Sequence, residues 1–219
     1  MQPLPLITDA DLAALREKVS GEMGEYRLRH TLSVEEEAVA MAKLYLPQNI
    51  PEIRAAALLH DITKECSFEE QLALCKRYGL TVSEEELASP KILHAKTAAA
   101  VIPDRYPAFA REDILDAIAK HTTGAAEMSI FAKILYLADY TEKTRAFPDC
   151  IKLRKYFWGV PLADMTKAER LVHLDKTLLM SFEMTIADLA REGCTTATAT
   201  NEAYAATARA LGVKIDTKK

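Results

Sequence analysis

The sequence is poor in the residues that build turns and disulfide frameworks. Its 219 residues include seven glycines, nine prolines and four cysteines. So few glycines and prolines exclude a collagen-like or low-complexity chain and disfavour a turn-rich β-sandwich. The cysteines form no Cys-x-x-Cys pair, and a chain of this length needs no disulfide staples. We therefore expect reduced thiols, packed as small core residues, in a cytoplasmic protein.

Three further absences limit the partners of this protein. Lys and Arg (28) do not outnumber Asp and Glu (32), so the net charge of −4 lacks the basic excess typical of nucleic-acid-binding proteins. No apolar run reaches the roughly 18 residues of a membrane span. The first residues lack the basic and apolar stretches of a signal peptide. We predict no nucleic-acid or membrane partner, whereas a small phosphorylated ligand could still be bound by a few local cations.

Apolar residues recur at helical spacing along most of the sequence. Leu12, Leu15 and Val19, for example, follow one another at intervals of three and four residues. No segment is a convincing β-strand. We predict an all-α, single-domain helical bundle of nine or ten helices over residues 1–219, with a core at about 20–150 and C-terminal helices at about 165–212.

Capping residues, prolines and glycines predict the limits of these helices. Three pairs have the spacing of a capping box: Thr8 with Asp11, Ser67 with Glu70, and Ser83 with Glu86. One helix is expected to run to residue 62 and another to end at residue 102, before Pro103. Gly79, Gly124 and Gly193 follow predicted helix ends. We expect a polar turn at 195–201 and a last helix at about 202–211.

Histidines and two carboxylates are the residues best suited to chemistry. Four of the five histidines fall at the inward edges of predicted helices: His30, His60, His94 and His121. Asp61 follows one of them directly, and Asp139 is a lone carboxylate in an apolar segment. Because an unpaired buried carboxylate is very costly, Asp139 is either at a helix end or in a site. The fifth histidine, His173, lies among charged residues and is expected at the surface.

Each of these residues also has a structural interpretation. A single histidine on an apolar helix face is more often a hydrogen-bonded core residue than a ligand, and the acidic runs 35–37 and 84–86 are expected to be solvated or capping faces. The joint occurrence of four histidines and two carboxylates beside apolar stripes favours a metal site. Imidazole nitrogen and carboxylate oxygen suit Fe, Mn and Zn alike.

Five longer strings make the pattern specific: RLRHTLSV (27–34), AALLHDITKE (56–65), ILHAKTAA (92–99), AIAKHTTG (117–124) and ILYLADYTEKTRAFP (134–148). Together they resemble the YqeK family of HD-domain metal-dependent phosphohydrolases. Members of that family are bacterial proteins that hydrolyse diadenosine tetraphosphate symmetrically to two ADP. The resemblance covers about residues 20–210.

The resemblance implies roles for particular residues. It implies a dinuclear site with iron as the expected metal, Mn and Zn as alternatives, and six ligands: His30, His60, Asp61, His94, His121 and Asp139. It implies a phosphate-binding set of Arg27, Lys64, Thr122, Thr123 and Arg145. Asp61, bridging the metals, and Lys64 are the implied catalytic residues.

The implied reaction is the attack of a metal-activated water on phosphorus of a nucleotide substrate. Two alternatives stay open at this point. The protein could be an HD-domain phosphohydrolase acting on another substrate, such as a nucleoside monophosphate, a deoxynucleoside triphosphate or a cyclic nucleotide. It could also be a non-catalytic nucleotide-binding protein. The oligomeric state is open as well, with a homodimer among the options.

Overall fold

The computed structural model describes residues 5–214, which form α-helices and short 3-10 helices and contain no strand. The α-helices are α1 (Asp9–Ser20), α2 (Glu25–Tyr45), α3 (Ile50–Leu59), α4 (Phe68–Arg77), α5 (Glu84–Ala88), α6 (Leu93–Arg105), α7 (Glu112–Lys120), α8 (Ile130–Thr141), α9 (Pro148–Trp158), α10 (Lys167–Arg191) and α11 (Thr198–Ala210). The 3-10 helices are η1 (Pro47–Asn49), η2 (Pro90–Ile92), η3 (Pro107–Phe109) and η4 (Leu162–Asp164). The all-α prediction is confirmed, whereas the eleven α-helices of residues 5–214 exceed the nine or ten predicted.

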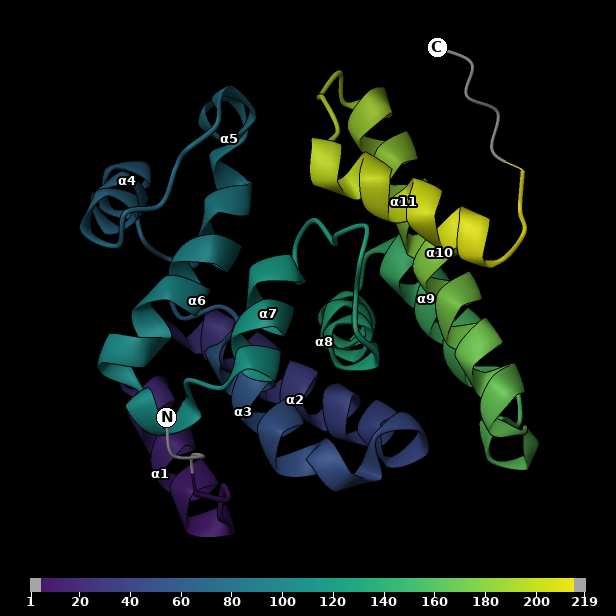
Figure 1. Cartoon of the computed structure of the whole chain (residues 1–219), viewed down its shortest axis with the longest axis horizontal. Coiled ribbons are helices and arrows are strands. Elements are labelled where there is room, and N and C mark those ends of the chain that lie inside the picture. Colours follow the sequence, from purple (N-terminus) through teal and green to yellow (C-terminus); the bar gives the residue numbers. More distant parts are fainter. Residues whose placement is uncertain (1–4, 215–219) are drawn as a thin grey trace.

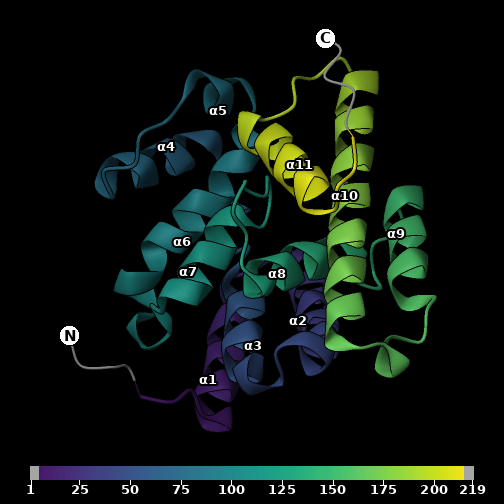
Figure 2. The ribbon, with the colours of Figure 1, turned by 45° about the vertical axis from the view of Figure 1, so that its right-hand side comes forward.

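The helices pack around a central group made of α2, α3, α7 and α8 (Figure 1). Helix α2 contacts α3 and α8, and α7 contacts α3, α6 and α8. The long helix α10 stands beside this group, with α9 and α11 packed against it (Figure 2). Within residues 5–214, no helix combines the length and the apolar character needed to cross a membrane.

Two helices of the central group are apolar on almost every side. In α3, all residues from Ala55 to Leu59 are buried, and in α8 the run from Ile134 to Ala138 is buried as well. Burying apolar surface contributes roughly 25 cal/mol per Å². These two helices are therefore held in the core, and this fixes the positions of the residues at their C-terminal ends.

Most of the predicted helix signals are confirmed. Capping boxes form at Thr8, Ser67 and Ser83, where each side chain accepts a hydrogen bond from the backbone N–H three residues later. Gly79 and Gly193 follow α4 and α10 with φ of 65° and 70°, a conformation that favours glycine. These local signals depend only on neighbouring residues, which is why the sequence displays them directly.

Three predicted helix limits are wrong, and one helix was missed. Helix α3 ends at Leu59, so that His60 and Asp61 lie in the turn that follows instead of on the helix. Helix α6 continues through Pro103, because a proline in the last turn removes only one helical hydrogen bond, and the Tyr106 N–H still reaches the carbonyl of Ile102. Helix α11 begins inside the expected polar turn, and α9 was not predicted at all.

Three predicted exposures are also wrong. His173 is buried in α10, stacked on Tyr156, with its Nε2 atom 3.1 Å from the carbonyl oxygen of Phe157. Glu35 is buried because Arg16 and Arg54 both donate hydrogen bonds to its carboxylate. Among the cysteines, Cys75 and Cys150 are buried as expected, whereas Cys66 is half-buried and Cys194 is exposed.

Candidate metal centre

Five segments bring the six predicted ligands into one buried cluster. His30 comes from α2, His60 and Asp61 from the turn after α3, His94 from α6, His121 from the end of α7, and Asp139 from α8. The four histidines and Asp61 are buried, and Asp139 is half-buried. Two overlapping groups have ligand atoms within 4.8 Å of one another: His30, His60 and Asp139, and His60, Asp61 and His121.

Hydrogen bonds fix the orientation of every imidazole ring in the cluster. The Nδ1 atoms of His60, His94 and His121 lie 2.7, 2.6 and 2.7 Å from the carbonyl oxygen three residues earlier. The Nδ1 atom of His30 lies 3.1 Å from the Glu142 carboxylate. Since these acceptors need a donor, each Nδ1 carries the proton when the ring is neutral. The lone pair of each ring is then on Nε2.

The four rings form a continuous row. Ring centroids are 5.5 Å apart between His30 and His60, 5.0 Å between His60 and His121, and 4.9 Å between His121 and His94. The Nε2 atoms of His94 and His121 are only 3.0 Å apart. Two neutral imidazoles that both hold their protons on Nδ1 cannot hydrogen-bond through Nε2, so this pair presents two lone pairs to the same space.

Asp61 lies between the two halves of the row. Its Oδ2 atom is 3.4 Å from the Nε2 of His60 and 3.8 Å from that of His30. Its Oδ1 atom is 3.3 Å from the Nε2 of His94 and 3.5 Å from that of His121. The two oxygens of one carboxylate therefore face two different histidine pairs.

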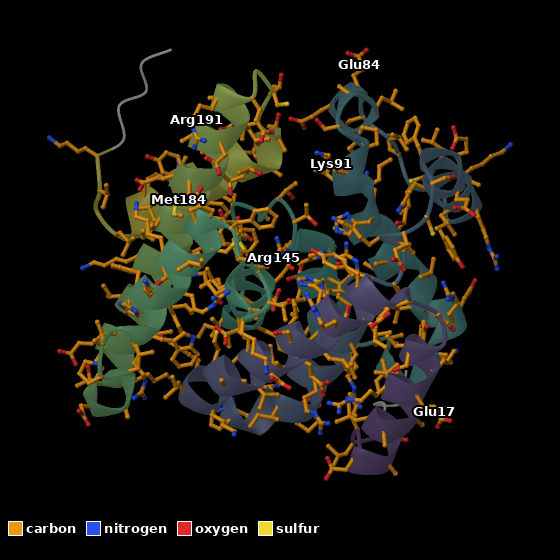
Figure 3. The ribbon with its side chains drawn as sticks, turned by 180° about the vertical axis from the view of Figure 1, so that it is seen from behind. Glu17, Glu84, Lys91, Arg145, Met184 and Arg191 are labelled. Carbon is orange, nitrogen blue, oxygen red and sulfur yellow. The ribbon has the colours of Figure 1, made fainter. Side chains whose placement is uncertain are left out.

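An arginine lies against each carboxylate. Arg27 is 2.5 Å from Asp61 Oδ2, and Arg145 is 2.6 Å from Asp139 Oδ1. The same Asp139 oxygen lies 2.9 Å from the Nε2 atom of His30. Arg145 lies near the middle of the face seen in Figure 3, with Lys91 above it. Two predicted phosphate-binding residues thus border the cluster, each held by a predicted ligand.

The acid–base properties of the cluster follow from these contacts. Burial opposes charging of Asp61 and Asp139, but the neighbouring histidines and Arg145 hold both pKa values well below the usual range. Burial also lowers the pKa of His30, yet hydrogen bonds to Asp139 and Glu142 raise it to about 9. Burial lowers the pKa of His94 to about 4. At neutral pH the cluster therefore holds ionised carboxylates and, at His94, a neutral imidazole.

The donor set fits divalent metal ions. Among the described residues, His60 Nε2 and Asp61 Oδ1 are buried atoms without a hydrogen bond, and both point into the cluster. Leaving buried polar atoms unpaired is costly, so these atoms are suited to bind a cation. Imidazole nitrogen and carboxylate oxygen are ligands for Fe, Mn or Zn. The prediction of a divalent-metal site is supported.

Lys64 and Thr122 lie at the His94 side of the cluster. The Nζ atom of Lys64 is 3.2 Å from both ring nitrogens of His94. The Thr122 hydroxyl is 3.0 Å from the Nε2 of His94 and 3.2 Å from that of His121. A cavity of about 400 Å³ opens here, lined by Lys64, Cys66, Phe68, Gln71, Pro90, Lys91 and His94. Burial lowers the pKa of Lys64.

Thr123 lies outside these contacts. Its hydroxyl bonds to the carbonyl of Gly124, and its own carbonyl accepts a hydrogen bond from Thr200 of α11 at 2.9 Å. Gly124 has φ of 70°, and a Cβ atom there would lie 2.7 Å from the ring of Phe182 in α10. Helices α10 and α11 therefore hold the loop that follows His121.

A buried polar network that the sequence did not reveal supports the turn after α3. The hydroxyl of Thr63 donates to the carbonyl of His94 at 3.0 Å, and the amide of Gln71 donates to the carbonyl of Thr63 at 2.5 Å. The Thr97 hydroxyl donates to the Gln71 side-chain oxygen at 2.5 Å. Glu142 was missed as well. Thr63, Thr97 and Glu142 lie inside the family strings, but their residue types are common in helices and loops, so the sequence assigned them no role.

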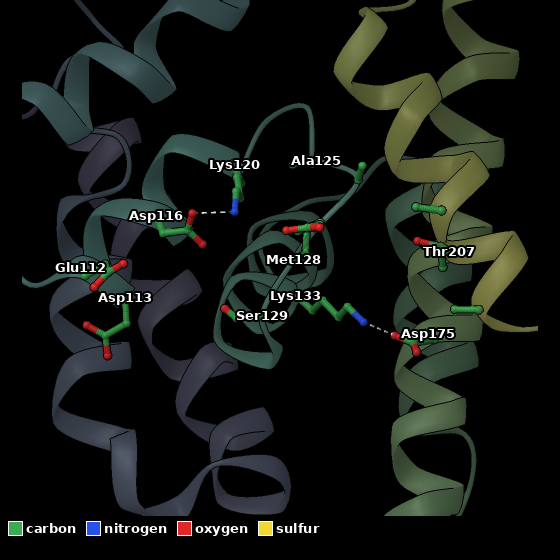
Figure 4. Close-up of a pocket in the computed structure, with 14 residues that line it drawn as sticks. Glu112, Asp113, Asp116, Lys120, Ala125, Met128, Ser129, Lys133, Asp175 and Thr207 are labelled. Carbon is green, nitrogen blue, oxygen red and sulfur yellow. Dashed lines mark hydrogen bonds and ion pairs between the residues drawn. The ribbon is translucent and has the colours of Figure 1, made fainter.

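A larger cavity lies outside this cluster. It measures about 870 Å³ and is lined by α7, α8, α10, α11 and the loop at 125–129 (Figure 4). Its two lysines are paired, Lys120 with Asp116 at 2.5 Å and Lys133 with Asp175 at 2.6 Å. None of the six predicted ligands lines it. The unpartnered ligand atoms, and not cavity size, identify the candidate site.

The predicted ligands all fall inside one recognised region. Residues 27–144, more than half of the chain, match the HD domain. The chain belongs to the HD-domain family. In this HD-domain protein the matched region runs from α2 to α8 and includes all six clustered histidines and aspartates.

Known relatives of this HD-domain protein share one description. A symmetrical bis(5'-nucleosyl)-tetraphosphatase of Halalkalibacterium halodurans is 36% identical over 137 residues, which are 62% of this chain and 71% of the relative. The protein of the same description from Bacillus subtilis is 32% identical over 63% of this chain and 72% of its own length. The predicted relationship to symmetrical tetraphosphatases is confirmed.

A solved structure extends the likeness beyond the matched region. The crystal structure of a predicted HD superfamily hydrolase involved in NAD metabolism, from Clostridium acetobutylicum, superimposes with a TM-score of 0.77. The two chains are 29% identical, and the match covers 90% of this chain and 97% of the other. The match therefore takes in most of the C-terminal helices as well as the HD domain.

Proposed function

We propose that this protein is a metal-dependent hydrolase that cleaves diadenosine tetraphosphate symmetrically to two ADP. The observation that carries the proposal is Asp61, whose two oxygens face two different histidine pairs. One carboxylate between two ligand groups is suited to a pair of cations. The tetraphosphatases related to this chain support the choice of substrate.

Six side chains would hold the cations: His30, His60, Asp61, His94, His121 and Asp139. We propose a dinuclear iron site, with Mn or Zn as alternatives that the same ligands accept. Divalent cations bound there would supply positive charge to phosphate oxygens and lower the pKa of a water molecule. Because a histidine binds a metal as a neutral imidazole, the occupied site would keep a net positive charge toward a polyphosphate.

The remaining predicted residues would bind the substrate phosphates. Lys64 offers a compact ammonium beside His94, and Arg27 and Arg145 offer planar guanidinium groups that can bind phosphate through two hydrogen bonds. Thr122 adds a hydroxyl next to His94 and His121. We also propose that Thr123 contacts a phosphate, because it follows Thr122 in the same loop.

The cavity next to Lys64 would take one nucleoside half of the substrate. Its volume of about 400 Å³ and its lining by Phe68, Pro90 and Cys66 suit a purine ring, and Lys64 joins it to the cluster. We also propose that the whole chain acts as one domain, with the core at about 20–150 and the C-terminal helices at about 165–212.

The test is product analysis. Freshly purified protein is incubated under reduced oxygen with diadenosine tetraphosphate and Fe(II) or Mn(II), and the products are separated chromatographically. ADP as the sole product, abolished by a chelator, is the expected result. AMP together with ATP would contradict symmetrical cleavage. The absence of any product with all metals would contradict the proposed activity.

Variants test the ligand assignment. His60→Ala and Asp61→Ala are expected to lose both metal and activity while the helical circular dichroism is kept. His173→Gln is the control, because His173 is also buried but lies against the Phe157 carbonyl and contacts none of the six predicted ligands in the described residues. Near-normal turnover and metal content in His60→Ala would show that the assignment is wrong.

A further inference from the structure

One buried carboxylate stands behind the cluster and has no assigned role. Glu142 is fully buried at the C-terminal end of α8, three residues after Asp139. Its Oε1 atom is 3.1 Å from the Nδ1 of His30. The backbone N–H of Thr144 donates to Oε2 at 2.5 Å, and the hydroxyl of Thr144 donates to Oε1 at 2.7 Å. Both oxygens are therefore fixed in place.

This arrangement makes His30 unlike the other three histidines. His60, His94 and His121 each place Nδ1 against a neutral backbone carbonyl of their own segment. His30 alone places Nδ1 against a charged carboxylate, which comes from a different helix. A carboxylate acceptor makes the opposite ring nitrogen a stronger base and a stronger metal ligand than a carbonyl does.

No arginine or lysine of the described residues forms an ion pair with the Glu142 carboxylate. Arg27 and Arg145 lie against Asp61 and Asp139, which offsets the charge of those two carboxylates. Within residues 5–214, the only ion pair of the Glu142 carboxylate is the one with His30. Arg154 donates to the backbone carbonyl of Glu142, not to its side chain.

We propose that Glu142 is a positioning residue that makes the two halves of the cluster unequal, so that metal loads first at His30, His60 and Asp139. This half combines the strengthened His30 with a carboxylate of its own, Asp139. The half at His94 and His121 has two carbonyl-oriented imidazoles and shares Asp61. This inference depends on the metal site of the proposed function but not on its substrate.

The experiment is a metal titration without substrate. Chelator-treated protein is titrated with Mn(II) or Zn(II) alone, and binding is followed by calorimetry and by equilibrium dialysis. The wild type is expected to bind in two unequal steps. Glu142→Gln, which keeps an oxygen acceptor for His30 but removes the charge, is expected to weaken the first step by about 10–100-fold and to leave the second unchanged. Glu142→Asp is expected to restore part of the first step.

A half-buried carboxylate on the same helix as His30 provides the control. Glu37 accepts hydrogen bonds from Trp158 at 2.7 Å and Thr141 at 2.9 Å but contacts no histidine, so Glu37→Gln should leave both steps unchanged. Equal steps in the wild type, or an equal weakening of both steps in Glu142→Gln, would overturn the proposal. Failure to hydrolyse diadenosine tetraphosphate would refute the proposed function instead, since the titration contains no nucleotide.

Discussion

Replacement of Gly124 by alanine tests how the C-terminal helices support the site. Gly124 has φ of 70°, and the left-handed backbone costs a residue with a Cβ roughly 1–2 kcal/mol. The new Cβ would lie 2.7 Å from the Phe182 ring and 3.1 Å from the Cβ of Ala203. Phe182 is fully buried in the core, so a shift of its ring would disturb its neighbours. Such overpacking costs about 1–3 kcal/mol more.

The control for this variant lies on the surface. Gly79 has nearly the same φ, 65°, but a Cβ there would meet no atom within 4 Å. Gly79→Ala should therefore lose only the backbone contribution of roughly 1–2 kcal/mol, against about 2–5 kcal/mol for Gly124→Ala. Urea and thermal unfolding measure both, with roughly 2–4 °C in Tm per kcal/mol at this chain length.

The two variants should also differ in function. Because Gly124 follows His121 by three residues, a shift of this loop should lower metal content and turnover, whereas Gly79→Ala should leave both unchanged. Equal losses of stability in the two variants would refute the reasoning from the Phe182 contact. Full metal content in a strongly destabilised Gly124→Ala would refute the link between the loop and the ligand.

Three further predictions concern single side chains. Burial raises the pKa of Glu37 above its usual 4.5, so the wild type loses stability as pH rises from 4.5 through the raised pKa and this carboxylate ionises. Glu37→Gln does not ionise, so chemical denaturation should show it gaining stability relative to the wild type over that pH range. Lys64→Ala should keep its metal but lose turnover, as measured by metal analysis and ADP release, and unchanged turnover would place Lys64 outside the reaction. Thr200→Val removes the donor to the Thr123 carbonyl, with an expected loss of about 0.5–1.5 kcal/mol in urea unfolding; a loss within error would show that the contact is dispensable.

The sequence predicted the helical fold and the six clustered residues because both have strong local signatures. Apolar spacing and capping boxes depend on neighbours in the chain, and the His-Asp pair stands in a recognisable string. The limits at Leu59 and Thr198 could not be predicted in this way. At Leu59, the His60 ring and the Thr63 network favour a turn over another helical turn. At Thr198, the backbone N–H donates a hydrogen bond to the Glu85 carboxylate of α5, which is far away in the sequence.

The residues behind the cluster could not be predicted for the same reason. Glu142 and Gln71 have ordinary neighbours, and their roles arise only when α8 meets α2 and α4 meets α6. His173 shows the converse error, since its charged neighbours in the chain suggested exposure. In the folded protein Tyr156 and Phe157 of α9 cover it, and α9 was itself absent from the prediction.

The carbonyl contacts of three histidines have a consequence for how this site tolerates mutation. His60, His94 and His121 are oriented by backbone oxygens of Ala57, Lys91 and Ile118. Every amino acid supplies that oxygen, so substitutions at the three carbonyl positions can leave ring orientation intact wherever their side chains fit. Adding or deleting one residue within any of these three-residue spacings would move the carbonyl out of reach. Among related chains, the amino acid at each carbonyl position should therefore vary widely, whereas the number of residues between that carbonyl and its histidine should stay the same.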